Sequence, residues 1–217
     1  MTWPIHVPRS YTYINANWIE SHRGTGHRYI ATQGPMNNTV FAFWRMILET
    51  GCRSIVMVTG LIEKGRSKCA KYWPEAPTAL DIAGISVENI GTVRQNGFLI
   101  SDLVVTLGSD IRTVRHFWYD SWPDHGVPDK TEPLLGLMQF AQDWDGSTEV
   151  LGRPWTVHCS AGIGRTGAFL AIDLGVRTME QGEEVNVIDI ISKGGLVGAM
   201  VLGFGLILGR LPGSFSF

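Results

Sequence analysis

The chain has few of the features that mark extracellular, metal-binding or nucleic-acid-binding proteins. Its three cysteines, Cys52, Cys69 and Cys159, are scattered, and their spacing indicates neither a disulfide framework nor a zinc site. The 18 Lys and Arg residues are balanced by 20 Asp and Glu residues, so no bulk positive charge favours nucleic acid as a partner. The first residues lack the charged lead and apolar core of a signal peptide.

No linker, low-complexity tract or internal repeat interrupts the chain. We therefore expect one domain in 1–192, followed by a divergent, apolar, Gly-rich tail in 193–217. The tail contains sixteen uncharged residues at 194–209, six of them glycine. That run is shorter than the ~20 residues that span a bilayer, and glycine disfavours helix. Membrane association is not expected; the alternatives are an altered splice product, a gene-model error or a strand-like replacement for a helix.

Hydrophobic periodicity predicts an α/β fold. Helices are predicted at 39–49, with Gly51 placed to end the first of them, at 133–144 after a proline, and at 168–176. Strands are predicted at 54–59, 85–87, 98–107, 113–119 and 155–158, with a turn at 95–97. The expected architecture is a twisted mixed sheet flanked by helices, with a phosphate-binding loop at its carboxyl edge between a central strand and a helix.

That loop is the segment 157–167, which reads Val-His-Cys-Ser-Ala-Gly-Ile-Gly-Arg-Thr-Gly. Five residues separate Cys159 from Arg165, enough to wrap one tetrahedral anion. Glycines at 162 and 164 let successive N–H groups point inward at the positive end of the following helix. A sulfur held there is expected to be a nucleophilic thiolate, and the planar guanidinium of Arg165 matches two phosphate oxygens. The predicted phosphate-binding residues are Ser160, Ala161, Gly162, Ile163, Gly164 and Arg165.

The alternative interpretation of this loop is a glycine-rich turn with a buried structural cysteine, but the flanking His158 and Thr166 also suit phosphate chemistry. Thr166 can donate a hydroxyl hydrogen bond to the sulfur once phosphate has left. An alkoxide or phenolate leaving group needs a proton, which a general acid must supply. Asp124 is the best candidate, because two prolines and a glycine bracket it in a stiff loop at 122–128, which we call the acid loop. Taken alone, Asp124 fits an ordinary surface turn equally well.

With both loops in place, the chain resembles the catalytic domain of the cysteine-dependent, phosphotyrosine-specific protein tyrosine phosphatases. The matching segments lie in the family's order, from about Tyr13 to Ser192: 13–17 (YINAN), 29–35 (YIATQGP), 43–46 (FWRM), 54–59 (SIVMVT), 68–74 (KCAKYWP), 122–128 (WPDHGVP) and 158–167 (HCSAGIGRTG). The resemblance implies a hydrolase that needs no metal or other cofactor and acts on phosphotyrosine-containing proteins in signalling.

The resemblance also implies roles for individual residues. Cys159 forms a phosphocysteine, Arg165 binds the phosphate and the transition state, and Asp124 serves as general acid and then as base. His158 helps to hold the environment of the thiolate, and Thr166 supplies the hydroxyl next to the arginine. The supporting residues are Glu63, which orients the arginine, Lys64, and Lys68, which approaches the acid loop. A reducing, cytoplasmic compartment is expected, either for a soluble protein or for the cytoplasmic part of a membrane-bound parent, since the thiolate oxidises readily elsewhere.

Two departures from the family pattern lie near the ends. Neither Tyr11 nor Trp3 lies in the Asn-Arg-Tyr pattern whose tyrosine stacks on the substrate ring. After Ser192 the resemblance fades, and Gly198 stands where the family has the glutamine that positions the hydrolytic water. Three interpretations follow: a protein-tyrosine phosphatase, an impaired phosphotyrosine-binding module, and a phosphatase whose shallower pocket also admits phosphoserine.

Overall fold

An eight-stranded mixed sheet is the framework of the computed structural model, which describes residues 13–20, 28–124, 126–147 and 152–193. Its strand order is β1-β2-β10-β3-β9-β8-β7-β6. The strands are β1 (Ala16–Glu20), β2 (Arg28–Thr32), β3 (Ser54–Met57), β6 (Thr78–Ile82), β7 (Ile85–Gln95), β8 (Phe98–Leu107), β9 (Asp110–Trp118) and β10 (Trp155–His158). A separate two-stranded hairpin consists of β4 (Ile62–Glu63) and β5 (Arg66–Ser67).

Parallel pairing is confined to the centre of the sheet. Strand β10 runs parallel to β2 on one side and to β3 on the other, and β3 runs parallel to β9. The β1–β2 pair and the β9-β8-β7-β6 series are antiparallel. Central parallel strands are buried on both faces, which explains why all four residues of β3 and of β10 are buried. The loop after β10 therefore begins at the carboxyl edge of the sheet, as predicted.

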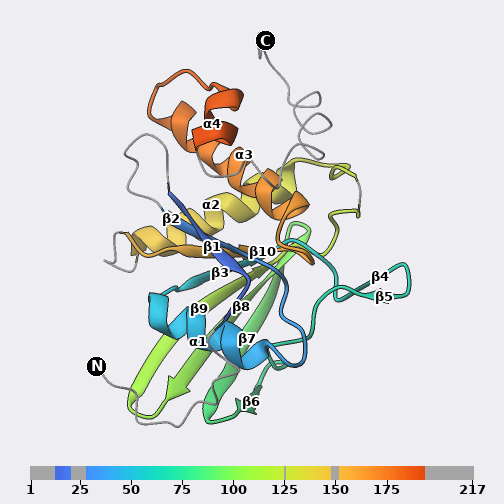
Figure 1. The fold of residues 1–217 in the computed structure, drawn as a ribbon, viewed down its shortest axis with the longest axis vertical. Helices are drawn as coiled ribbons and strands as arrows, with labels where there is room; N and C mark the ends of the chain where they lie inside the picture. Colours follow the sequence, from blue (N-terminus) through green and yellow to red (C-terminus); the bar gives the residue numbers. More distant parts are fainter. Residues whose placement is uncertain (1–12, 21–27, 125, 148–151, 194–217) are drawn as a thin grey trace.

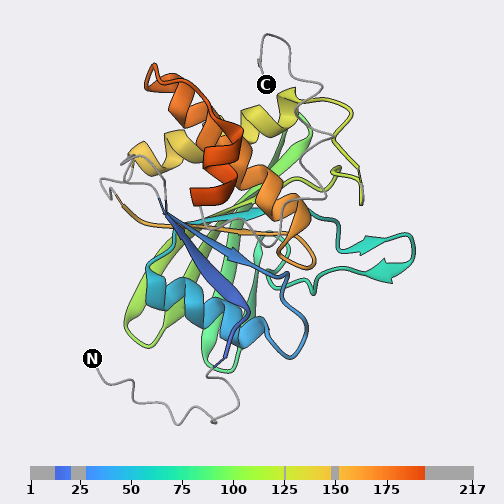
Figure 2. The ribbon, with the colours of Figure 1, turned by 45° about the horizontal axis from the view of Figure 1, so that its top comes forward.

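Helices cover both faces of this sheet, as Figures 1 and 2 show. Helix α1 (Val40–Thr50) packs Phe43, Trp44 and Ile47 against the face that carries Ile55 and Met57 of β3. On the opposite face, α2 (Glu132–Ser147), α3 (Gly164–Glu180) and α4 (Val187–Lys193) pack in the cluster that contains Val56 and Val157. Full burial of one large apolar side chain contributes about 1.5–3 kcal/mol, so these two cores fix the position of the loop between β10 and α3.

The structure confirms the fold class and corrects several boundaries. Gly51 ends α1 in the left-handed conformation with φ 68°, and Asn96 and Gly97 form the two-residue turn between β7 and β8. The strand predicted at 85–87 extends to Gln95. The prediction ended too early because the second half of the strand is mostly exposed and shows no alternation of apolar and polar residues. The helix predicted at 168–176 begins four residues earlier and ends at Glu180. The remaining predicted elements differ from the observed ones by at most three residues at either end.

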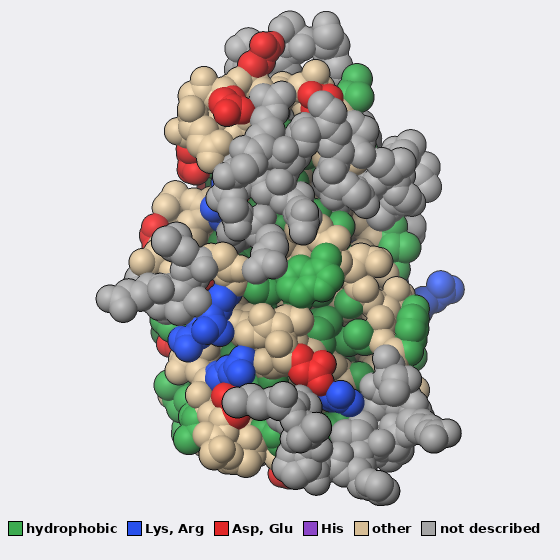
Figure 3. All heavy atoms as spheres, turned by 60° about the vertical axis from the view of Figure 1, so that its left-hand side comes forward, with side chains coloured by type: hydrophobic (Ala, Val, Ile, Leu, Met, Phe, Trp, Pro, Cys, Tyr) green, Lys and Arg blue, Asp and Glu red, His purple; other side chains and the backbone are tan. Residues whose placement is uncertain are grey.

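Figure 3 shows one face of the molecule, on which basic and acidic side chains both occur and neither sign covers the surface. Among the described residues, the longest apolar helices fall short of what a membrane crossing requires. The tail at 194–217, Gly198 and the first twelve residues lie outside the described residues, as does His125 of the acid loop.

Candidate active site

The predicted phosphate loop closes tightly against the end of β2. Gly162 has a φ of 75°, and a Cβ built on it would lie 2.4 Å from the carbonyl oxygen of Thr32. The amide of Gly34 donates a hydrogen bond of 2.9 Å to the carbonyl oxygen of Ser160. Only glycine fits position 162, because both the conformation and the close approach of two backbones exclude a side chain.

The remaining loop residues divide into anchors and an open rim. The hydroxyl of Ser160 donates to the carbonyl oxygen of Lys68 at 2.9 Å, which ties the loop to the segment after β5. Ala161, Ile163 and Gly164 are exposed, and Gly164 is the first residue of α3. The loop thus has a fixed base and an accessible rim at a helix N-terminus, where the helix dipole favours an anion.

Cys159 follows the last residue of β10 and is 3% exposed. Its carbonyl oxygen lies 3.0 Å from Nδ1 of His158, and a Cβ built on Gly34 would lie 2.5 Å from the same oxygen. Nearby Cys69 is also buried and free; burial, and after it the charge on Cys159, raises the pKa of the Cys69 thiol to about 12. The Cys69 thiol therefore stays protonated and unreactive at neutral pH. Cys159 differs in its position, because it is the residue with which the turn from β10 to the phosphate loop begins.

Arg165 lies in the first turn of α3, and its guanidinium is held by two elements of the chain. Its two terminal nitrogens donate to the two carboxylate oxygens of Glu63, at 2.6 and 3.1 Å. One of them also donates to the carbonyl oxygen of Trp122, at 3.0 Å. The side chain of Arg165 is only 9% exposed, and these contacts fix the orientation of its planar guanidinium.

Glu63 is itself held by a dense set of donors. Its Oε1 also accepts from the hydroxyl of Thr59 and the amide of Gly60, each at 3.0 Å. Burial, the largest single influence, favours the neutral acid, but the hydrogen bonds from Arg165 and Gly60 and the charge of Arg165 together hold the pKa of Glu63 below its ordinary value. Glu63 is thus a carboxylate at neutral pH and balances the charge of the guanidinium.

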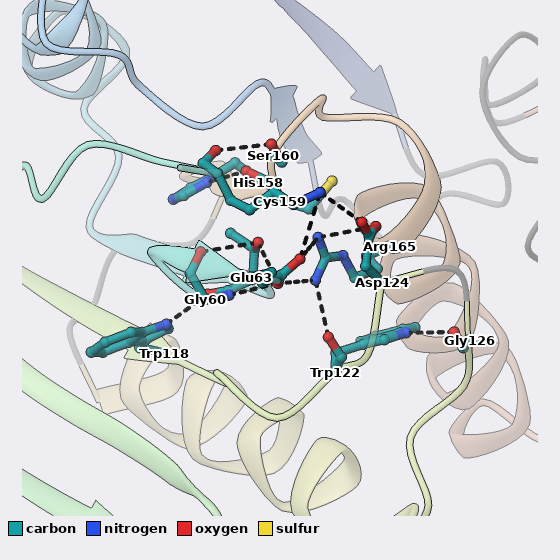
Figure 4. Close-up of polar contacts among 12 residues, drawn as sticks. Gly60, Glu63, Trp118, Trp122, Asp124, Gly126, His158, Cys159, Ser160 and Arg165 are labelled. Atoms are coloured by element: carbon teal, nitrogen blue, oxygen red, sulfur yellow. Dashed lines mark hydrogen bonds and ion pairs between the residues drawn. The ribbon is translucent and has the colours of Figure 1, made fainter. Parts of the chain in front are cut away.

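The acid loop meets the phosphate loop at this arginine, as Figure 4 shows. One oxygen of Asp124 lies 3.7 Å from Arg165, and the other accepts from the ammonium group of Lys68 at 2.6 Å. The indole N–H of Trp122 donates to the carbonyl oxygen of Gly126 at 3.1 Å, which closes the loop around Asp124. Two segments about forty residues apart in sequence therefore present one carboxylate and one guanidinium to the same space.

Two predicted residues lie differently from the rest. Lys64 is exposed in the turn between β4 and β5, with φ 48°, and makes no ion pair within the described part of the chain. Thr166 is fully buried, but its hydroxyl has no hydrogen-bond partner among the described residues, so its predicted contact with the sulfur is not formed here. Lys68, in contrast, lies between Asp124 and Glu63, at 3.8 Å from the latter.

Sequence reasoning assigned no role to two residues that are linked to His158 by hydrogen bonds. The hydroxyl of Tyr72 lies 2.8 Å from Nε2 of His158 and 2.7 Å from Nε2 of His116. Burial lowers the pKa of His158 to about 4, opposed by its hydrogen bond to the Cys159 carbonyl, and burial, followed by the nearby His158, holds the pKa of His116 well below its ordinary value. Tyr72 belongs to the matched segment 68–74, which was the only available signal for it.

Comparisons with known proteins find one family over most of the chain. The sequence model described as "Protein-tyrosine phosphatase" matches residues 5–194. Receptor-type tyrosine-protein phosphatase R of Rattus norvegicus is 42% identical over 191 residues, which cover 86% of this chain and 28% of the relative. Tyrosine-protein phosphatase non-receptor type 5 of Homo sapiens is 38% identical over 180 residues, which cover 83% of this chain and 31% of the relative. The chain thus spans about a third or less of these relatives.

A solved structure described as the structural basis of the PTPN18 fingerprint on distinct HER2 tyrosine phosphorylation sites shares the fold. It has a TM-score of 0.73 and 34% sequence identity, and the match covers 78% of this chain and 59% of the other. Because the family model spans most of the chain and the relatives are this similar, the chain belongs to the protein-tyrosine phosphatase family.

Proposed function

We propose that the chain hydrolyses phosphotyrosine in proteins through a phosphocysteine intermediate on Cys159. The observation that carries the proposal is the arrangement around Arg165. Glu63 and the Trp122 carbonyl fix its guanidinium at the end of the phosphate loop, and the carboxylate of Asp124 lies 3.7 Å from it. Cys159 begins the phosphate loop, Arg165 follows it in the first turn of α3, and Asp124 lies beside Arg165, so the nucleophile, the anion-binding fork and the acid of the proposed reaction come from adjoining segments.

In the first step the thiolate of Cys159 attacks phosphorus, an S–P bond forms, and the bond from phosphorus to the phenolic oxygen breaks. Asp124 gives its proton to that oxygen as it leaves. The guanidinium of Arg165 and the amides of the loop receive the charge that develops on the non-bridging oxygens. Because Glu63 holds the guanidinium in advance, little reorganisation is needed during the step.

In the second step water attacks the phosphocysteine. Asp124, now a carboxylate, takes a proton from the water, the S–P bond breaks, and the thiolate and inorganic phosphate are restored. Lys68 is bonded to Asp124 at 2.6 Å, and its own main-chain oxygen accepts from Ser160. In our proposal, Lys68 thus holds the acid loop and the phosphate loop in a fixed position relative to each other through both steps.

The exposed rim of the loop adjoins a hollow of about 410 Å³ between α3 and the first two strands. Ala161, Ile163 and the half-exposed Trp18 are among the residues that line it. An aromatic side chain that carries the phosphate could pack there, and the relatives' names specify tyrosine phosphatases. We propose that residues 1–192 form the catalytic unit and that it acts in the cytoplasm, in a soluble protein or as part of a membrane-bound parent.

A second candidate function is capture of phosphotyrosine without efficient hydrolysis. The observation that favours it is Gly198, which stands where the resemblance places the water-positioning glutamine. Under this alternative the first step proceeds and the phosphocysteine persists.

Steady-state phosphate release separates these candidates. We expect the wild-type protein to release phosphate from a phosphotyrosine peptide, and Cys159→Ser to release none. A matched phosphoserine peptide in parallel tests the broader specificity. Release no faster than that of Cys159→Ser would reject the phosphatase function for this chain. One equivalent of dephosphorylated peptide per protein, formed without release of inorganic phosphate, would instead support the binding module.

A further inference from the structure

Two buried histidines lie on strands that flank β3, and one tyrosine hydroxyl joins them. His158 pairs with Met57 of β3 on one side, and His116 pairs with Ile55 of β3 on the other. The hydroxyl of Tyr72 bridges the two Nε2 atoms across that strand, at 2.8 and 2.7 Å. All three side chains are almost fully buried, so water cannot substitute for these contacts.

The main-chain oxygen of Cys159 sets the direction of this chain of hydrogen bonds. A carbonyl oxygen only accepts, so Nδ1 of His158, 3.0 Å away, carries the proton. Nε2 of neutral His158 must then accept, and the Tyr72 hydroxyl donates to it. The oxygen of Tyr72 in turn accepts from the Nε2–H of His116. The order is therefore His116 to Tyr72 to His158 to Cys159.

The reverse order requires a cationic His158 that donates from both ring nitrogens. Complete burial lowers the pKa of His158 to about 4, and neither histidine forms an ion pair with a carboxylate in the described part of the chain. The assigned order also suits His116, whose Nδ1 is buried without a hydrogen-bond partner among the described residues. In this tautomer Nδ1 is a bare acceptor, whereas the opposite tautomer would bury an N–H donor with nothing to receive it.

We propose that His116 is a positioning residue which, through Tyr72 and His158, orients the peptide group that follows the nucleophile. The peptide unit is planar and trans, so its N–H, which belongs to Ser160, points opposite to the Cys159 carbonyl. With the carbonyl fixed on His158, that N–H is directed away from the histidine and is one of the amides of the phosphate loop. The direction of these hydrogen bonds is a property of the folded chain and does not depend on the proposed function. Only the effect of the oriented peptide group on catalysis rests on that function.

The proton order is tested first in the wild-type protein. Nitrogen-15 NMR of histidine-labelled protein at neutral pH distinguishes the two neutral tautomers and the cation. We expect the Nδ1–H tautomer for His158 and the Nε2–H tautomer for His116, assigned through His158→Gln and His116→Gln. The opposite pair of tautomers, or a cationic His158, would overturn the proposal.

The consequence for the nucleophile is tested by alkylation of Cys159 with iodoacetamide, with Cys159→Ser as the background. His116→Leu removes the terminal donor, and the rate should fall roughly fivefold, the effect of one net hydrogen bond. His116→Gln retains an N–H donor at a similar reach and should stay within twofold of wild type. Equal rates in wild type and His116→Leu would reject the positioning role. If His116→Leu fails to fold, as judged by circular dichroism, Tyr72→Phe serves in its place.

These readouts need no turnover, so they separate the two proposals. Predicted tautomers in a protein that releases no phosphate from a phosphotyrosine peptide would refute the proposed function and leave the hydrogen-bond chain intact. Phosphate release by a protein with the opposite tautomers would refute the chain alone.

Discussion

Replacing Glu63 by glutamine tests how much of the proposed catalysis depends on a preoriented arginine. The carboxylate accepts two hydrogen bonds from Arg165, at 2.6 and 3.1 Å, in a site where its side chain is 15% exposed. Hydrogen bonds to charged groups contribute about 1.5–3 kcal/mol each. Glutamine keeps one acceptor oxygen and turns an N–H₂ group toward the guanidinium, so we expect a loss of about 2–3 kcal/mol. At 1.36 kcal/mol per tenfold change, this lowers kcat/KM by roughly 30- to 150-fold.

The assay is phosphate release from a phosphotyrosine peptide at neutral pH, with thermal unfolding measured in parallel. Glu75→Gln is the matched control, because Glu75 is 79% exposed and, among the described residues, its carboxylate pairs only with Lys71 on the surface. We expect the control to keep wild-type kcat/KM. A Glu63→Gln variant that folds and stays within threefold of wild type would refute the argument that this carboxylate orients Arg165.

Three further predictions follow from contacts around the loop. The pKa of His158 is about 4 in the folded protein, below its ordinary 6.5, so the unfolded chain takes up the proton at a higher pH than the folded one. The free energy of unfolding should therefore be at its full value above about pH 6.5 and fall by up to ~3 kcal/mol as the pH drops to 4. Urea unfolding across that range measures it, and a flat profile would contradict the burial argument. Gly162→Ala, with φ 75° and the 2.4 Å approach to Thr32, should lower the free energy of unfolding by about 3 kcal/mol or more, whereas Gly164→Ala, which meets nothing within 4 Å, should change it by less than ~1 kcal/mol. Equal effects of the two alanines on urea unfolding would be inconsistent with the loop packing. Lys68→Met removes the 2.6 Å contact to Asp124 and should lower kcat about five- to tenfold while KM changes less. The surface variant Lys71→Met should leave both constants unchanged, and equal kinetics in the two variants would show that Lys68 has no role in positioning Asp124.

The phosphate loop was predictable because its chemistry is local. Cys159 and Arg165 lie six residues apart, and the strand before them and the helix after them show clear hydrophobic patterns. Gly51 and Gly97 were predictable for the same reason: each adopts a positive-φ backbone conformation that few other residues accept.

Contacts between distant segments were harder to predict. Glu63 and Arg165 are 102 residues apart, and only the resemblance brought them together. Lys64 came from the same resemblance, but it is exposed in the turn between β4 and β5 and forms no ion pair among the described residues. The link between Tyr72, His116 and His158 gave no sequence signal, because single polar residues on buried strands look the same whether or not they form a network.

The sheet edges were also missed in part. Strand β6 is almost entirely exposed, and the second half of β7 carries polar residues on both faces, so neither shows the apolar alternation that predicts a strand. Strands β1 and β2 matched the family segments but were not identified as strands. Their pairing with β10 became visible only in the folded sheet.

Trapping the covalent intermediate tests the central claim most directly. A peptide with phosphorus-32 on its phosphotyrosine is mixed with the protein, quenched in denaturant within one turnover, and the protein is digested and mapped. We predict label on the peptide that contains Cys159, and none in Cys159→Ser. Phosphate release without label on Cys159, or label that persists in Cys159→Ser, would contradict the proposed mechanism.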